Sequence, residues 1–250
     1  MLTTINLLLA ALFFFTALLY ASVGHAGASG YLAIMALFGL TAEVMKPTAL
    51  VLNILVASVA AFEFYRSGNF SWRVFWPFAL GSIPFAYIGG SLVLPMQYYK
   101  PLVGLLLLYS AFRMFTTGRG NGDSSQEYKP VPVWLGVLVG TGIGLLAGLT
   151  GVGGGIFLSP ILVLMNWADA RHTAGVAAAF ILVNSIAGLL GHVTSVANLP
   201  KPILLWCGAV VIGGYVGSYY GSTHFSNKAI KRWLALVLVI GGLRMFVEVF

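Results

Sequence analysis

The sequence of 250 residues is 59% hydrophobic and only 8% charged, with a mean hydropathy of +0.95. A soluble domain has about 25% charged residues, so this composition excludes a soluble enzyme or binding domain. It predicts an all-α protein that crosses the membrane several times. The net charge of +7 comes from Lys and Arg scattered at the ends of apolar runs, which is typical of loops that orient a membrane protein and not of a nucleic-acid-binding patch.

The apolar segments divide the chain into two halves with the same plan. Each half opens with an apolar hairpin, which is followed by three predicted spans. The first repeat, 1–117, holds the hairpin 5–40 and the spans 47–66, 74–95 and 98–117. The segment 118–131 is an aqueous linker. The second repeat, 132–250, holds the hairpin 133–167 and the spans 173–193, 202–221 and 229–249. A spanning helix needs about 20 residues. The runs 29–40 and 156–167 are too short, so each hairpin is expected to contain a broken helix.

The two hairpins are similar in sequence. The segment "LLYASVGHAGASGYLAI" (18–34) aligns with "LLAGLTGVGGGIFLSPI" (145–161) at a constant shift of 127 (151 − 24). This alignment matches Gly24 with Gly151 and Gly27 with Gly154. Broken helices at equivalent places in two repeats are typical of transporters that bind their substrate between the repeats.

The basic residues predict the orientation of the spans. If each hairpin enters and leaves on one side, nine of the thirteen Lys and Arg lie on one side, and four, including Lys46, lie on the other. If each opening segment crosses once, the split is seven to six. The positive-inside rule favours the first arrangement. Because three crossings per half is an odd number, the repeats are then inverted, with a cytoplasmic linker and both termini outside.

The stretch "GLTGVGGGIFLSPIL" (148–162) interrupts the second hairpin with glycines. Glycine adopts a positive φ readily and brings bare backbone close to a ligand, and non-helical backbone persists in a membrane only inside protein or along a wet cavity. Ser159 and Pro160 suit an N-cap and a first helical position, so a short helix is expected to begin between Gly155 and Pro160. Its N-terminus would attract an anion. The alternative is that the glycines only let helices pack closely.

These motifs resemble a known family. The glycine stretch, its degenerate copy after Tyr20, the segment "HTAGVAAAFILVNSIAGLLGH" (172–192) and the duplicated layout are similar to the sulfite exporter TauE/SafE family. The resemblance implies a secondary transporter of sulfite, a sulfonate or a related anion in a prokaryotic inner membrane, whose halves rock to expose the substrate alternately. The first half departs from the motif, since His25 and Ala26 stand opposite Val152 and Gly153.

The candidate site residues lie at the two hairpin tips and in the following span. The candidates for binding the substrate are Gly24, His25, Gly27, Ser29, Thr150, Gly151, Gly153, Gly154, Gly155, Asn184 and Ser185. His25 and Glu63 are candidates for proton coupling, because histidine titrates near neutral pH and intramembrane acids are often functional. Polar residues within spans, such as Asn53, also serve as helix–helix hydrogen-bonding groups. A small anion and the lipid bilayer are the expected partners, and no metal or cofactor is expected.

Two alternatives share parts of this pattern. A passive anion channel would have nearly the same features. An intramembrane serine protease would use Ser29 in "GASG" (27–30) as nucleophile and His192 as base, although the residue matched to Ser29 in the second copy is Ile156. Substitution Gly154→Val is expected to abolish anion binding while leaving folding mostly intact.

Overall fold

The structure, a computed structural model, describes residues 4–92, 94–116, 128–223, 239–240 and 243. Within these residues the regular elements are helical, which confirms the all-α prediction. In chain order they are α1 (Thr4–Ala21), α2 (Ala28–Leu37), α3 (Ala42–Arg66), α4 (Trp72–Ser91), α5 (Met96–Thr116), α6 (Val133–Thr150), α7 (Gly155–Leu164), α8 (Ala170–Gly191), the 3₁₀ helix η1 (Val193–Asn198) and α9 (Ile203–Thr223). The predicted span 229–249 and most of the linker lie outside the described residues.

The described helices fall into long and short ones. Five helices, namely α1, α3, α6, α8 and α9, are long and apolar enough to cross a membrane. Helices α4 and α5, of 20 and 21 residues, occupy the predicted spans 74–95 and 98–117. Helices α2 and α7 have only 10 residues each, so both hairpins contain a break followed by a short helix, as expected. Together these lengths describe a multi-pass membrane protein.

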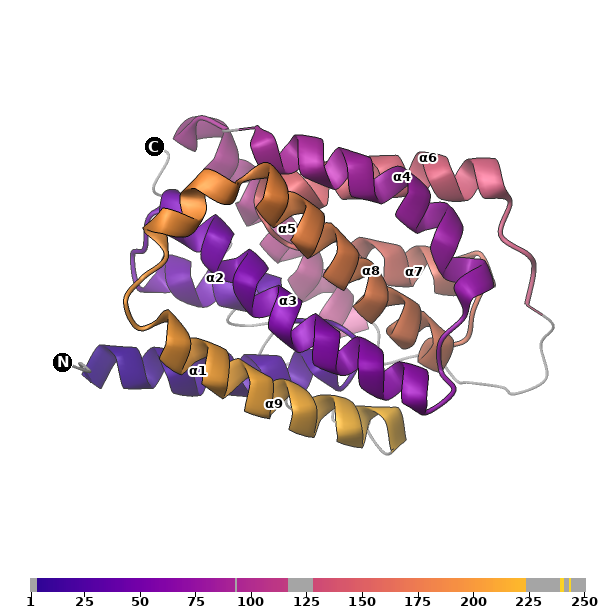
Figure 1. Cartoon of the computed structure of the whole chain (residues 1–250), viewed down its shortest axis with the longest axis horizontal. Helices are drawn as coiled ribbons and strands as arrows, with labels where there is room; N and C mark the ends of the chain where they lie inside the picture. The colour runs from indigo at the N-terminus through magenta and orange to yellow at the C-terminus, as the bar shows by residue number, and fades with distance from the viewer. Residues whose placement is uncertain (1–3, 93, 117–127, 224–238, 241–242, 244–250) are drawn as a thin grey trace.

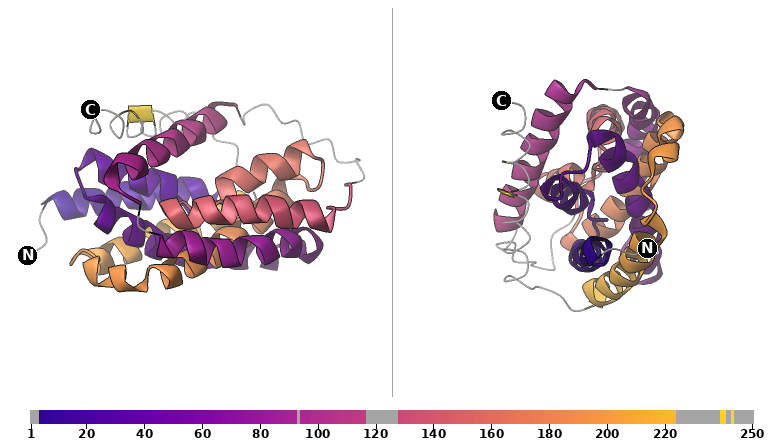
Figure 2. Two further views of the ribbon diagram at one scale, coloured as in Figure 1. Left: turned by 90° about the horizontal axis from the view of Figure 1, so that it is seen from above. Right: turned by 90° about the vertical axis from the view of Figure 1, so that its left-hand side faces the viewer.

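Helices from the two halves of the chain pack against each other in pairs. Helix α4 lies along α6 and α1 lies along α9, while α3 and α8 pack together between these pairs (Figure 1). In Figure 1, α1 and α9 both run from left to right, whereas α4 and α6 both run from right to left. The views in Figure 2 show that these helices form one bundle with roughly lengthwise axes. The first and second halves are therefore interleaved and not separate bodies.

Glycines hold the paired helices at close range. A Cβ added to any of three glycines of α6 would overlap a carbonyl oxygen of α4, and the same is true of three glycines of α9 facing α1. These glycines are Gly140, Gly144 and Gly148 on α6 and Gly213, Gly217 and Gly221 on α9. A small residue at every fourth position lets membrane helices approach backbone to backbone. The close-packing interpretation of glycine is thus correct for these helices.

Candidate functional site

The two hairpin tips adopt the same unusual backbone. In the first tip, Gly24 has φ 74° and Gly27 has φ 99°. In the second tip, Gly151 has φ 82°, Gly153 has φ 79° and Gly154 has φ 83°. Side chains with a Cβ rarely adopt this left-handed conformation, so glycine is required there. The matched pairs Gly24 with Gly151 and Gly27 with Gly154 therefore also agree in conformation, whereas Ala26 does not share the positive φ of Gly153.

Each short helix begins directly after a left-handed glycine. Helix α7 begins at Gly155, within the expected range, and α2 begins at Ala28. The prediction that Ser159 caps α7 was wrong, because Ser159 lies inside the helix and donates to the carbonyl oxygen of Gly155 at 2.9 Å. Gly155 is itself the first helical residue, so the left-handed glycines of this tip end at Gly154. Among the described residues no N-cap side chain caps either helix. In α7 the N–H groups of Phe157 and Leu158 already donate to the carbonyl oxygen of Gly154, so only the first N–H groups of each helix are left for a ligand.

Each tip packs against the opening of a helix in the other half. Gly24 lies against the backbone of Ala174 in α8, and Gly151 lies against Lys46 in α3, whose carbonyl oxygen would be 3.3 Å from an added Cβ. A side-chain contact also links the first tip to the second hairpin, because His25 Nε2 lies 3.2 Å from the hydroxyl oxygen of Ser159. The structure thus brings the first tip into contact with the second hairpin.

A cluster of buried polar side chains surrounds the second tip. The Nδ2 group of Asn53 lies 3.4 Å from the hydroxyl oxygen of Ser185 and 3.5 Å from the carbonyl oxygen of Val152. Bonds of this length are weak. Within the described part of the chain, three buried oxygens lack a hydrogen-bond partner: Oγ1 of Thr48, Oδ1 of Asn53 and Oδ1 of Asn184. Buried polar atoms in native proteins are almost always paired, so these three oxygens are candidate contacts for water or a bound solute.

Lys46 lies against the second tip, and the sequence analysis did not single it out. Its ammonium lies 3.1 Å from the carbonyl oxygen of Gly90 and 3.5 Å from that of Leu92, at the end of α4. The negative end of a helix stabilises a cation, and no carboxylate among the described residues forms an ion pair with Lys46. Only 5% of its surface is exposed, so counting it as a loop charge was wrong. Helix α3 begins five residues before the predicted span, with Thr41 at its N-cap and Glu43 in its first turn. These two residues are a helix-start signal that the sequence analysis overlooked.

The remaining hydroxyl and amide candidates are buried and already bonded within their own hairpin or helix. The hydroxyls of Ser29 and Tyr20 share a hydrogen bond of 2.8 Å, and Thr150 donates to the carbonyl oxygen of Leu146 at 2.7 Å. The Nδ2 group of Asn184 donates to the carbonyl oxygen of Phe180 at 2.8 Å. These groups shape the site, and only Asn184 keeps an unpaired acceptor.

Glu63 lies apart from the second tip. It is half-buried in the last turn of α3, and it lies about 25 Å along that helix from Lys46 at 1.5 Å per residue. Its neighbour Phe64 packs against Gly175 of α8. Of the two candidates for proton coupling, only His25 is brought to the contact between the hairpins.

The expected behaviour of Gly154→Val needs correction. Gly154 is left-handed, and an added Cβ would lie 2.8 Å from Cγ2 of Ile143 and 3.0 Å from Cε1 of Phe180. Valine would therefore strain the backbone and overpack the core. The expectation that folding stays intact was wrong, and the site has to be tested by other substitutions.

Comparison with known proteins agrees with this architecture. The family model described as "Sulfite exporter TauE/SafE" matches residues 9–245. A probable membrane transporter protein of Sinorhizobium fredii is 40% identical over 238 residues, which cover 95% of this chain and 96% of the relative. A probable membrane transporter protein of Methanocaldococcus jannaschii is 28% identical over 209 residues, covering 79% and 77%. No solved structure matches the chain. The match over nearly the whole length, together with the multi-pass helical fold, shows that the chain belongs to the sulfite exporter TauE/SafE family of membrane transporters.

Proposed function

We propose that the protein is a secondary transporter that exports a small sulfur-containing anion, such as sulfite or an organosulfonate, and that it binds the anion at the contact between the two hairpin tips. One observation carries the proposal. The left-handed turn Gly151–Gly154 leads into the uncapped N-terminus of α7, and the backbone and Cγ of the buried residue Lys46 lie against Gly151 at the start of this turn. The family description supports the class of substrate.

The charges at this site favour an anion. The first N–H groups of a helix and the positive end of its dipole bind negative groups. Lys46 adds a full positive charge that only backbone carbonyls balance among the described residues. In a site of low dielectric an unbalanced buried charge is costly, so a bound anion would stabilise this arrangement.

The unpaired acceptors narrow the class of anion. The Oδ1 atoms of Asn53 and Asn184 can accept a hydrogen bond but cannot donate one. An anion with its own donor, such as hydrogensulfite or an amino sulfonate with its ammonium group, would satisfy both these oxygens and the N–H groups of α7. Sulfate has no donor at neutral pH and is expected to bind less tightly.

The helix arrangement supports two inverted repeats within this transporter. Helix α1 pairs with α9 and α6 pairs with α4, which are equivalent pairs if the two halves share one plan. Equivalent helices run in opposite directions in Figure 1. The distribution of basic residues supports a cytoplasmic linker with both termini outside, in a prokaryotic inner membrane.

Flux measurements in liposomes test the function. Purified full-length protein is reconstituted, and uptake of sulfite, sulfate, taurine and acetate is followed with and without a pH gradient. We expect sulfite or taurine to accumulate against its own gradient when a pH gradient is imposed. Movement of anions only down their gradients would identify a channel instead, and equal rates for acetate and sulfite would contradict the proposed substrate class.

A further inference from the structure

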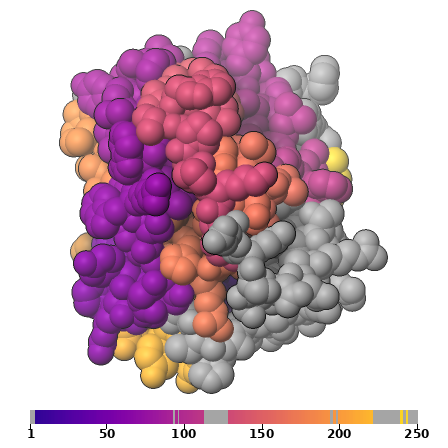
Figure 3. Space-filling model, turned by 90° about the vertical axis from the view of Figure 1, so that its right-hand side faces the viewer, coloured from indigo at the N-terminus to yellow at the C-terminus, as the bar shows by residue number. Residues whose placement is uncertain are grey.

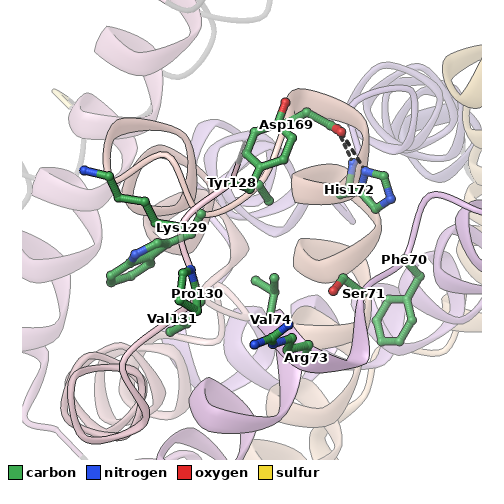
Figure 4. A pocket seen from close by; sticks show the side chains of 12 residues that line it. Phe70, Ser71, Arg73, Val74, Tyr128, Lys129, Pro130, Val131, Asp169 and His172 are labelled. Atoms are coloured by element: carbon green, nitrogen blue, oxygen red, sulfur yellow. Dashed lines mark hydrogen bonds and ion pairs between the residues drawn. The ribbon is translucent and has the colours of Figure 1, made fainter. Parts of the chain in front are cut away.

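A cavity of about 340 Å³ opens between the beginnings of α4 and α8 and the segment 128–131, which leads from the linker into α6 (Figure 4). We call it the linker-side cavity. Its apolar lining includes the buried side chains of Val74 and Trp167. Figure 3 looks onto this end of the molecule, where the segments around residues 70, 130 and 168 lie close together. The cavity is separate from the hairpin tips and has no role in the site described above.

Positive charge dominates the linker-side cavity. Arg73 and Lys129 line it together with His172. Among the described residues that line it, the one carboxylate is Asp169, and it is already engaged. Its Oδ1 accepts from the backbone N–H of His172 at 2.8 Å, and its Oδ2 lies 2.7 Å from Nδ1 of that residue. In Figure 4 this pair lies on the opposite side of the cavity from Arg73. The guanidinium of Arg73 is therefore free of this carboxylate, whereas the side chain of Lys129 extends away from the middle of the cavity in Figure 4.

Two further features affect the electrostatic potential in the linker-side cavity. Partial burial raises the pKa of Asp169, but hydrogen bonds from His172 and from the backbone of Arg171 lower that pKa below its usual value, so the carboxylate is ionised and opposes anion binding. Helices α4 and α6 begin at the cavity without an acidic residue in their first turns. Their N-terminal dipoles add to the charges of Arg73 and Lys129.

We propose that the linker-side cavity is a second anion site, which receives the oxyanion head group of the transported solute from the linker side before it reaches the hairpin tips. This inference rests on the proposed function. The volume equals that of about ten waters at about 30 Å³ each, which suffices for sulfite or a short organosulfonate. Ala174, two residues after His172 on α8, contacts Gly24 of the first tip. One helix therefore connects the linker-side cavity with the hairpins.

Calorimetric titration of sulfite into the full-length protein in phosphatidylcholine nanodiscs tests the proposal. Arg73→Gln is expected to weaken binding two- to fivefold, a range typical of partly exposed charge pairs. Asp169→Asn is expected to strengthen binding by a similar factor, because asparagine keeps the N-cap of α8 and removes the opposing charge. Arg66→Gln is the matched control, since Arg66 is an exposed arginine outside the cavity lining, and it should leave binding unchanged. Unchanged binding in both cavity variants, or a shift in the same direction, would overturn the proposal.

Repeating the titration in a Lys46→Met background separates this inference from the proposed function. Sulfite binding that remains in this background and still depends on Arg73 supports the cavity even if the hairpin site is wrong. A phospholipid head group offers the same oxyanion chemistry, so nanodiscs containing phosphatidylglycerol form a further arm. If phosphatidylglycerol removes the effect of Arg73→Gln on sulfite binding, the cavity holds lipid and its role in receiving the solute is overturned.

Discussion

The imidazole Nε2 of His25 lies 3.2 Å from the hydroxyl oxygen of Ser159 and so joins the two hairpins across 134 residues of sequence. The other ring nitrogen, Nδ1, lies 3.0 Å from the carbonyl oxygen of Val23. Because a carbonyl only accepts, Nδ1 carries a proton in this arrangement. A charged ring can donate from Nε2 to Ser159 while the Ser159 hydroxyl keeps its hydrogen bond to Gly155. When the ring is neutral, Nε2 can only accept, and Ser159 must turn its one hydroxyl hydrogen from Gly155 to Nε2. The contact can therefore persist while a proton is gained or lost.

Substitution His25→Gln should uncouple transport from the pH gradient. Glutamine can keep a hydrogen bond to Ser159 but cannot take up a proton at neutral pH. We expect accumulation of sulfite driven by a pH gradient to fall at least about tenfold, within the usual range of coupling energies, while equilibrium binding of sulfite changes little. Gradient-driven uptake and calorimetry on the same preparation measure the two effects.

Glu63→Gln is the matched control for coupling, because Glu63 lies in the last turn of α3, away from the contact between the hairpins. It should leave gradient-driven uptake intact. If this variant lost all coupling of uptake to the pH gradient while His25→Gln kept it, the proton pathway would lie at the end of α3 instead.

Lys46→Met should weaken anion binding strongly. Methionine keeps the buried aliphatic chain but removes the charge and the hydrogen bonds to Gly90 and Leu92. A hydrogen bond between the ammonium and the bound anion would contribute about 1.5–3 kcal/mol, so its loss should raise the dissociation constant for sulfite about ten- to a hundredfold. Lys201→Met, at an exposed lysine, should have no effect in the same titration. An unaltered dissociation constant in Lys46→Met would show that this residue does not bind the anion.

Gly153→Ala should lower both stability and transport. The residue is left-handed, and its new Cβ would lie 2.8 Å from Cγ2 of Ile181 and 2.9 Å from Nδ2 of Asn53. Strain of this kind costs about 1–3 kcal/mol, which a thermal-denaturation curve in detergent will show. In Gly142→Ala the new Cβ meets nothing within 4 Å, and unfolding temperature and flux should match the parent. Normal flux in Gly153→Ala would indicate that the second tip tolerates displacement and does not hold the anion.

Ser29→Ala tests the protease alternative. The hydroxyl of Ser29 is buried and bonded to that of Tyr20, so its removal should cost about 1 kcal/mol of stability and leave sulfite transport largely intact. Incubation with a model transmembrane peptide should give no cleavage products with either protein. Cleavage by the parent that disappears in Ser29→Ala would establish proteolysis.

The sequence predicted those features that depend on local backbone. The glycines at 151, 153 and 154 demanded a break because only glycine adopts their conformation freely. The first copy repeated that break even with His25 in place of Val152. The helix lengths followed from the apolar runs, except at α3, where Thr41 and Glu43 extended the helix backwards to include Lys46.

Contacts between distant segments could not be predicted in the same way. The carbonyl groups that hold the ammonium of Lys46 lie 44 and 46 residues further along the chain, and Asn53 meets Ser185 across 132 residues. Such contacts depend on which helices pair, and hydrophobic periodicity does not encode this when every helix is apolar. Likewise, the sequence showed Arg73, Lys129 and His172 only as separate charges near span ends.

The glycine rows on α6 and α9 also limit how this protein can change shape. Each row fastens a helix of one half to a helix of the other, with backbone touching backbone. Tilting one half as a rigid body would separate α1 from α9 and α4 from α6 at these glycine contacts. It would also expose polar backbone to hydrocarbon. A conformational change that kept these contacts would therefore move α1 together with α9 and α4 together with α6.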